Sequence, residues 1–124
     1  MIGTVSDERF PRSVYGVGDE PDPRFSLANE RTFLAWIRTS LALLAAGVAL
    51  EGLNLALQPG FRFAASVLLI VLGLLTPLQA WRGWARDERA MRLRAPLASP
   101  TLASPLTIGA VLAGLLVLAG LVLR

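Results

Sequence analysis

The sequence predicts an all-α membrane protein with three transmembrane helices, the first of them extended at its cytoplasmic end. Hydrophobic residues make up 54% of the 124-residue chain and charged residues only 17%. Three mostly apolar segments are each long enough to cross a hydrocarbon core about 30 Å thick, which takes roughly 20 helical residues. The second and third segments lack the polar stripe that an exposed helix of a soluble bundle carries. A soluble three-helix bundle is therefore disfavoured.

Along the chain, a flexible cytoplasmic tail is predicted over residues 1–21 and a three-span membrane domain over residues 22–124, with spans at about 33–57, 63–81 and 102–123. The tail mixes Gly, Pro, Ser and acidic residues without periodicity, which is typical of a segment without regular structure. The chain does not begin with a short apolar core followed by a cleavage site, so we expect no signal peptide.

The first span is the inner part of a longer predicted helix. Asp22 is a favourable N-cap, and Pro23 suits the first helical position, where its missing N–H costs nothing. With no further proline before Leu57, we expect this helix to continue through Leu57. Residues 58–62 contain a Pro-Gly pair and predict a tight turn into the second span. Pro77 is expected to kink the second span near its end.

The arginines predict how the spans are oriented. Arg24 and Arg31 precede the first span, and five more lie in the connection between the second and third spans: Arg82, Arg86, Arg89, Arg92 and Arg94. The turn at 58–62 and the C-terminal end carry one arginine each. Because arginine-rich connections stay in the cytoplasm, the N-terminus is predicted to be cytoplasmic and the C-terminus to lie outside.

Composition argues against an enzyme. The chain has neither Cys nor His, which excludes thiol nucleophiles, imidazole bases and the usual zinc sites. We therefore expect no enzymatic activity, no cofactor and no metal, and no nucleic acid as a partner. The expected surroundings are the lipid bilayer and its anionic headgroups.

Three arginines form a ladder on the first helix. Arg24, Arg31 and Arg38 are seven residues apart, so they lie close to one face with a drift of about 20° per step, and they span about 21 Å along the axis. One interpretation is an anchor in which Arg38 bends back to the headgroups. The other is a vestibule shared by several copies, where rings of guanidinium groups face anions and bind phosphate in bidentate fashion.

Other polar residues predict contacts between helices. Glu30 is a candidate partner for Arg86 or Arg89, since that segment returns to the same interface, and Asn29 is a candidate polar contact. Residues 82–94 are predicted to extend the second span and to contact anionic headgroups or form a mouth for anions. Further expected contacts are a Glu51–Arg62 pair across the turn and two small-residue pairs in the third span, Gly109/Ala113 and Ala110/Gly114.

The stretch Leu27–Trp36, LANERTFLAW, resembles the signature of the YidH-like family, which comprises small three-span bacterial inner-membrane proteins with no firmly assigned function. The run RDERAMR over 86–92 resembles the basic segment after the second span in that family. The resemblance covers residues 22–124. It implies a multi-pass protein of the bacterial inner (plasma) membrane.

The same motif is similar to the one that opens the membrane domain of the eukaryotic vacuolar transporter chaperone complex, which makes polyphosphate and passes it through an oligomeric, basic-lined channel. That similarity implies roles for Arg24 and Arg31, whose positions match basic residues of the motif. Arg38 departs from it, because a neutral residue is usual there. The chain also lacks the polymerase and phosphate-sensing domains, so the similarity implies an architecture and an anion path, not an activity.

We therefore expect a homo-oligomeric scaffold or channel-like subunit that presents stacked arginines to anions, phosphate-bearing ligands or polyphosphate. The alternative is a non-conducting accessory protein that recruits or stabilises a partner through its basic cytoplasmic face. A small transporter is disfavoured, because three spans show neither inverted repeats nor helices broken at mid-membrane.

Overall fold

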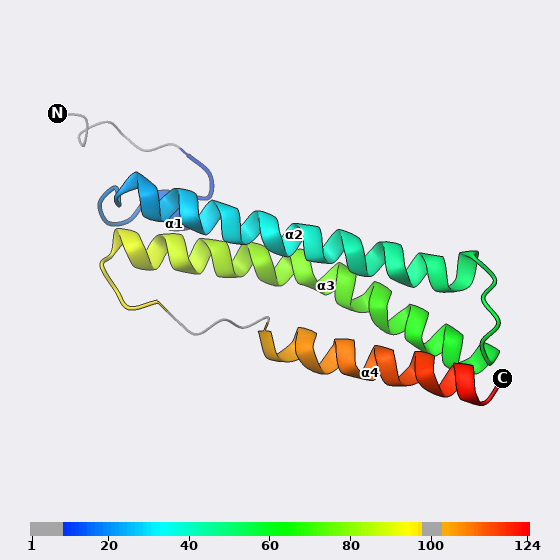
Figure 1. Ribbon diagram of the computed structural model, residues 1–124. Helices are drawn as coiled ribbons and strands as arrows, with labels where there is room; N and C mark the ends of the chain where they lie inside the picture. Colours follow the sequence, from blue (N-terminus) through cyan, green and yellow to red (C-terminus); the bar gives the residue numbers. More distant parts are fainter. Residues whose placement is uncertain (1–8, 98–102) are drawn as a thin grey trace.

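The computed structural model describes residues 9–97 and 103–124, which form four helices and no strand. The helices are α1 (Arg12–Tyr15), α2 (Pro23–Gly52), α3 (Pro59–Arg92) and α4 (Ala103–Val122). The last three are each long and apolar enough to cross a membrane. The predicted all-α class with three membrane-spanning helices is confirmed (Figure 1).

Helix α3 lies in the middle of the three long helices (Figure 1). Helix α2 packs along it, α4 packs on another side of it, and α1 lies against its far end. Within the described residues α2 and α4 do not contact each other. One end of the molecule is rich in charge, and we call residues 9–32 and 82–97 the polar end; residues 33–81 and 103–122 form the apolar part.

The start of α2 follows the prediction and its end does not. The side chain of Asp22 accepts a hydrogen bond from the Arg24 N–H at 2.9 Å, and Pro23 is the first helical residue. The helix ends at Gly52 and not at Leu57. Glycine favours helix ends, and Asn54 follows with a φ of 54° in the left-handed region, which terminates the helix.

The other helix bounds differ from the predicted ones by fewer residues. Gln58 caps α3 by accepting a hydrogen bond from the Phe61 N–H at 2.9 Å, so the expected turn at 58–62 is already mostly helix. Helix α3 then runs without a break to Arg92, as predicted for an extension of the second span. Helix α4 ends at Val122, one residue before the predicted end, and the predicted first residue, Leu102, lies outside the described residues.

Helix α3 bends near its middle (Figure 1), and α2 compensates for the proline inside it. Pro77 has no N–H to donate to the carbonyl of Gly73. The hydroxyl of Ser40 on α2 donates to that carbonyl at 2.6 Å. Hydroxyl side chains commonly satisfy backbone groups that proline frees in membrane helices, because no water is available there. The predicted irregularity at Pro77 thus also fixes α2 to α3.

Small residues set the distance between helices in the apolar part. A Cβ built on Gly47 would lie 2.6 Å from Ile70 Cγ1 and 2.9 Å from the Ser66 carbonyl oxygen, so α2 and α3 are in backbone contact there. The Ser66 hydroxyl also donates to the Gly47 carbonyl at 2.6 Å. Close contact through small residues is how membrane helices associate without a hydrophobic driving force.

The two small-residue pairs expected on α4 have different surroundings. Gly109 and Ala113 are buried, and a Cβ on Gly109 would meet Leu72 of α3. Ala110 and Gly114 are exposed, and nothing lies within 4 Å of a Cβ on Gly114. Of the two predicted pairs, therefore, Gly109/Ala113 packs against α3, whereas Ala110/Gly114 packs against no described residue.

Residues 9–22 differ from the predicted flexible tail, because they fold back along the polar end of α3. We call them the N-terminal strap. Val14 of α1 is 1% exposed, and the N–H of Asp19 donates to the carbonyl of Arg92 at 3.0 Å. The strap is ordered by this tertiary partner and not by its own periodicity. Residues 1–8 of the predicted tail lie outside the described residues.

Candidate anion-facing site and the polar end

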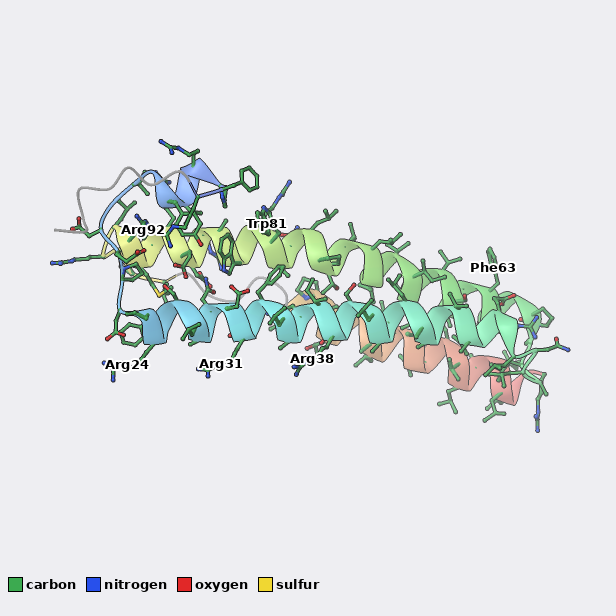
Figure 2. All side chains as sticks on the ribbon, turned by 90° about the horizontal axis from the view of Figure 1, so that it is seen from above. Arg24, Arg31, Arg38, Phe63, Trp81 and Arg92 are labelled. Carbon is green, nitrogen blue, oxygen red and sulfur yellow. The ribbon has the colours of Figure 1, made fainter. Side chains whose placement is uncertain are left out.

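Two rows of residues run along opposite faces of α2, each with a spacing of seven. The inner row is Ser26, Phe33, Ser40 and Gly47, and each member contacts α3. The outer row begins two residues earlier and contains Arg24, Arg31 and Arg38. Two residues turn a helix by about 200°, so the ladder must face away from α3. Figure 2 shows the three arginines together on that side of α2.

The three rungs have different surroundings. Arg24 forms an ion pair with the N-cap Asp22 at 2.8 Å. The hydrogen bond between them lowers the pKa of Asp22 and raises the pKa of Arg24. Arg31 and Arg38 are exposed, and neither has a hydrogen bond or ion pair with any described residue. The two upper rungs are thus available to a ligand or to another chain.

Arg38 lies inside the apolar part. Phe33 contacts Trp81 edge to face at 6.2 Å, and Ser40 bonds to Gly73, so Arg38 lies between these two levels of α3. The stretches 63–81 and 103–122, which supply α3 and α4 there, contain no acidic residue. Glu51 is about 20 Å further along α2 and forms the predicted pair with Arg62 at 3.2 Å. Among the residues that the structure describes, no carboxylate therefore lies at the depth of Arg38.

Asn29 makes the polar interhelical contact expected of it, although with an acid of α3. Its Nδ2 donates to the Trp84 carbonyl at 3.0 Å and to Glu88 Oε1 at 3.2 Å. The Ser26 hydroxyl donates to Glu88 Oε2 at 2.9 Å. Glu88 is only 3% exposed, so α2 satisfies a buried carboxylate with two neutral donors.

Glu30, Arg86 and Arg89 do not form the pair that the sequence predicts. Glu30 and Arg89 are exposed, and among the described residues no ion pair joins Glu30 to either arginine. Arg86 instead has its Nε 3.4 Å from Oδ1 of Asp87. One residue turns α2 by about 100°, so with Asn29 directed at α3, Glu30 lies on the flank of the helix.

Sequence reasoning missed Glu88 and Arg92 as contact residues. Glu88 follows Trp81 and Trp84 at i+7 and i+4, which places it on their helix face, and this spacing was an available signal.

Arg92 binds the strap through three hydrogen bonds, which we call the Arg92 clasp: Nε donates to the Val17 carbonyl at 2.8 Å, Nη2 to the Tyr15 carbonyl at 3.2 Å, and Nη1 to Glu20 at 2.9 Å. Its side chain is 5% exposed. No local pattern indicates this contact.

The clasp also changes the acid–base properties of the strap. Glu20 accepts hydrogen bonds from Arg9 at 2.9 Å as well as from Arg92. The Arg9 hydrogen bond, helped by Arg92, lowers the pKa of Glu20. Burial against α3 raises the pKa of the Tyr15 hydroxyl, and the nearby Glu88 carboxylate adds to that rise. In the described part of the chain, no group of three or more acidic residues could hold a metal ion.

Residues 24–90, from the first rung of the ladder to just beyond Glu88, match the model of a family described as a domain of unknown function, DUF202. The chain belongs to the DUF202 family. An uncharacterized protein from Mycobacterium tuberculosis is 46% identical over 101 residues, or 81% of this chain and 83% of the relative. No solved structure is significantly similar.

A second relative carries a descriptive name. The inner membrane protein YidH of Escherichia coli K12 is 48% identical over 82 residues, or 65% of this chain and 71% of YidH. The predicted YidH-like membership is thereby confirmed, and the protein is an integral membrane protein. The DUF202 match contains the ladder and the Asn29–Glu88 contact, whereas the strap and α4 lie outside it.

Proposed function

We propose that this DUF202 protein is an oligomeric inner-membrane scaffold or channel-like subunit, with its N-terminus in the cytoplasm, in which the outer faces of α2 gather and present the arginine ladder to anions. The observation that carries the proposal is the position of Arg31 and Arg38: both are exposed on the face opposite α3, and neither has an acidic partner in the described chain.

The position of Arg38 favours contact with another protein surface over contact with lipid. Insertion measurements put an arginine at about 2.5–3.5 kcal/mol at the centre of a membrane helix, and less toward the ends. Charged residues within spans usually face a protein interior or a water-filled cavity. Within one chain the ladder faces outward, so the cavity would lie against a neighbouring protein surface, and a second copy of the chain is the partner we propose.

The outer row continues into the apolar part with small residues. Ala45 and Gly52 follow Arg38 at the same spacing of seven, and Ala42 and Ala49 lie between them on the same face. A shallow surface depression lies over this part of α2. Because small residues permit close approach of membrane helices, copies that meet here would be closest in the apolar part. The arginines would then line a vestibule that is open toward the polar end.

Phosphate groups are the ligands that fit this vestibule. Because no acid in residues 9–97 or 103–124 lies at the depth of Arg38, the described part of another copy offers no counter-ion there, which favours an anion from outside the protein. A guanidinium binds phosphate through two parallel hydrogen bonds. Polyphosphate is one candidate, and the phosphate of a lipid headgroup is another.

Single-cysteine crosslinking tests the oligomer directly, because the natural chain has no cysteine. We expect Ala45→Cys to form disulfide-linked dimers in native membranes. Val67→Cys, which is exposed on α3, is the matched control and should stay monomeric. Equal crosslinking of the two variants, or none in either, would contradict the proposed contact between copies through this face of α2.

Anion binding is tested separately on purified protein with short-chain polyphosphate. Arg38→Gln should weaken binding by about tenfold, which corresponds to the loss of one charge-assisted contact. Arg124→Gln removes the same charge at the opposite end and should leave binding unchanged. Identical affinities for wild type and R38Q would contradict the proposed role of the ladder.

A second candidate is a non-conducting accessory protein. It is supported by the exposed arginines on and beyond the end of α3, Arg82, Arg89 and Arg94, which form no ion pair with a described residue. Anion flux into sealed proteoliposomes separates the two candidates. A scaffold that conducts gives a flux that falls in R38Q, whereas an accessory protein gives no flux with either form.

A further inference from the structure

Five aromatic residues from the strap, α2 and α3 meet at the junction of the polar end and the apolar part: Phe10, Tyr15, Phe33, Trp81 and Trp84. Phe10 stacks on Trp81 with ring centroids 6.3 Å apart, and Trp81 stacks on Trp84 at 5.0 Å. Phe33 meets Trp81 edge to face at 6.2 Å. The strap thus reaches back along α3 from the tip at Arg92 to Trp81 (Figure 2).

This cluster lies where charge begins on α3. Residues 63–81 are uncharged, and Arg82 is the first charged residue after them. Phe33 has the matching position on α2, just after Arg31 and Thr32. The level of Trp81 and Phe33 is therefore the level at which two of the three helices leave the hydrocarbon.

The side chain of Phe10 points outward, although other parts of the strap are attached to α3. The buried Val14 and the Arg92 clasp attach the strap to α3. Phe10 is nevertheless 79% exposed, and its partner Trp81 is 42% exposed. Most of the Phe10 ring therefore projects beyond the surface of the protein. Phe10 and Trp81 are stacked and both exposed, so together they form an apolar patch, and contiguous apolar patches mark interaction sites that include membrane surfaces.

We infer that the strap is an interfacial membrane anchor whose partner is the phospholipid headgroup layer. Phe10 and Trp81 insert side by side at the boundary between headgroups and acyl chains, where aromatic side chains are favoured. The exposed Arg82, next to Trp81, contacts the lipid phosphates. The strap then lies against both α3 and the bilayer surface. This inference does not depend on the proposed oligomer or on anion binding by the ladder.

Depth-dependent fluorescence quenching tests the inference. The protein has three tryptophans, so W36F, W81F and W84F are combined with Phe10→Trp to give a single reporter in phosphatidylcholine vesicles. We expect a nitroxide on the headgroup to quench it at least twice as strongly as a nitroxide at the end of the acyl chain. Leu93→Trp in the same background is the control, because it is exposed near the tip of α3, about 18 Å beyond Trp81. It should be insensitive to both lipids.

An F10W reporter as insensitive to both nitroxides as L93W would overturn the anchor. If the tryptophan-free background does not fold, Phe10→Cys and Leu93→Cys labelled with a polarity-sensitive dye keep the test available in otherwise natural protein. The label at position 10 should emit at shorter wavelength in vesicles than the label at position 93. Equal emission at the two positions would also overturn the inference.

Discussion

The polar end and the apolar part hold the same two helices together by different means. In the apolar part, α2 and α3 meet through glycine backbones and through hydroxyls that donate to carbonyls, as at Gly47 and Ser40. At the polar end they meet through the buried carboxylate of Glu88, which accepts from two α2 side chains. Contacts in lipid must satisfy every backbone group locally, whereas the polar end can use charged side chains. Their relative contributions are open to measurement.

The largest expected effect is at Gly47. In Gly47→Leu the new side chain meets the Ser66 carbonyl and the Ile70 backbone, which cannot move aside as a flexible side chain would. We expect a loss of about 3 kcal/mol in the free energy of unfolding, at the upper end of overpacking costs, measured by SDS titration in mixed micelles. Gly114→Leu is the control, because its site is open. Equal losses in both variants would show that this contact does not limit stability.

Glu88→Ala should have the next largest effect. It leaves the Ser26 hydroxyl and one Asn29 N–H without their acceptor, and a buried group left unsatisfied costs about 1–3 kcal/mol. We expect a loss of about 2 kcal/mol in the same titration. Glu30→Ala removes an exposed acid and should change stability by less than about 0.5 kcal/mol. If E30A is as destabilised as E88A, burial of Glu88 does not explain the effect.

Ser40→Ala is expected to act more weakly although the hydrogen bond is short. The Gly73 carbonyl loses its donor, but hydrogen bonds between membrane helices contribute on average only about 0.6 kcal/mol. Thr39→Ala is the control, since that hydroxyl bonds within α2 to the Ala35 carbonyl. A loss above about 2 kcal/mol in S40A would mean that the carbonyl freed by Pro77 makes this hydrogen bond much more stabilising than the average hydrogen bond between membrane helices.

Acid should loosen the strap with little effect on the rest of the protein. The pKa of Glu20 is lowered in the folded state, so its contribution is present above the ordinary glutamate pKa of about 4.3 and is lost as the pH falls through the lowered value. We expect the exchange protection of the Asp19 amide to fall in that range and to be lower and pH-independent in Glu20→Gln. Equal protection at pH 3 and pH 6 in the natural protein would contradict this.

Most features encoded within one helix were predictable, whereas the partners of most long-range contacts were not. The seven-residue spacing of the arginines predicted their shared face, and Asp22-Pro23 predicted the start of α2. The end of α2 at Gly52 was missed because apolar residues continue to Leu57, and hydropathy alone does not mark a backbone reversal. The strap was missed because Arg92, more than 70 residues away, orders it.

The candidate site was also predictable only in part: the shared face of the arginines was predicted, but not the direction in which that face points. To predict that the ladder faces away from α3, one must know which face of α2 is buried. That face contains Ser26 and Ser40, so hydrophobicity does not identify it. Glu88 belongs to residues 82–94, which were predicted to contact anionic headgroups or to form a mouth for anions. The structure places it inward, because α2 offers two hydrogen-bond donors at that level.

The separation of α4 from α2 has a consequence for biosynthesis. Helices α2 and α3 both end before residue 93, whereas α4 begins at Ala103. The ribosome therefore synthesises both partners of the α2–α3 contact before it synthesises α4. The first two helices can enter the bilayer as a finished pair. The last helix then needs to recognise one surface, on α3, and its end meets the α2–α3 turn where the Gln58 N–H donates to the Gly120 carbonyl at 2.9 Å.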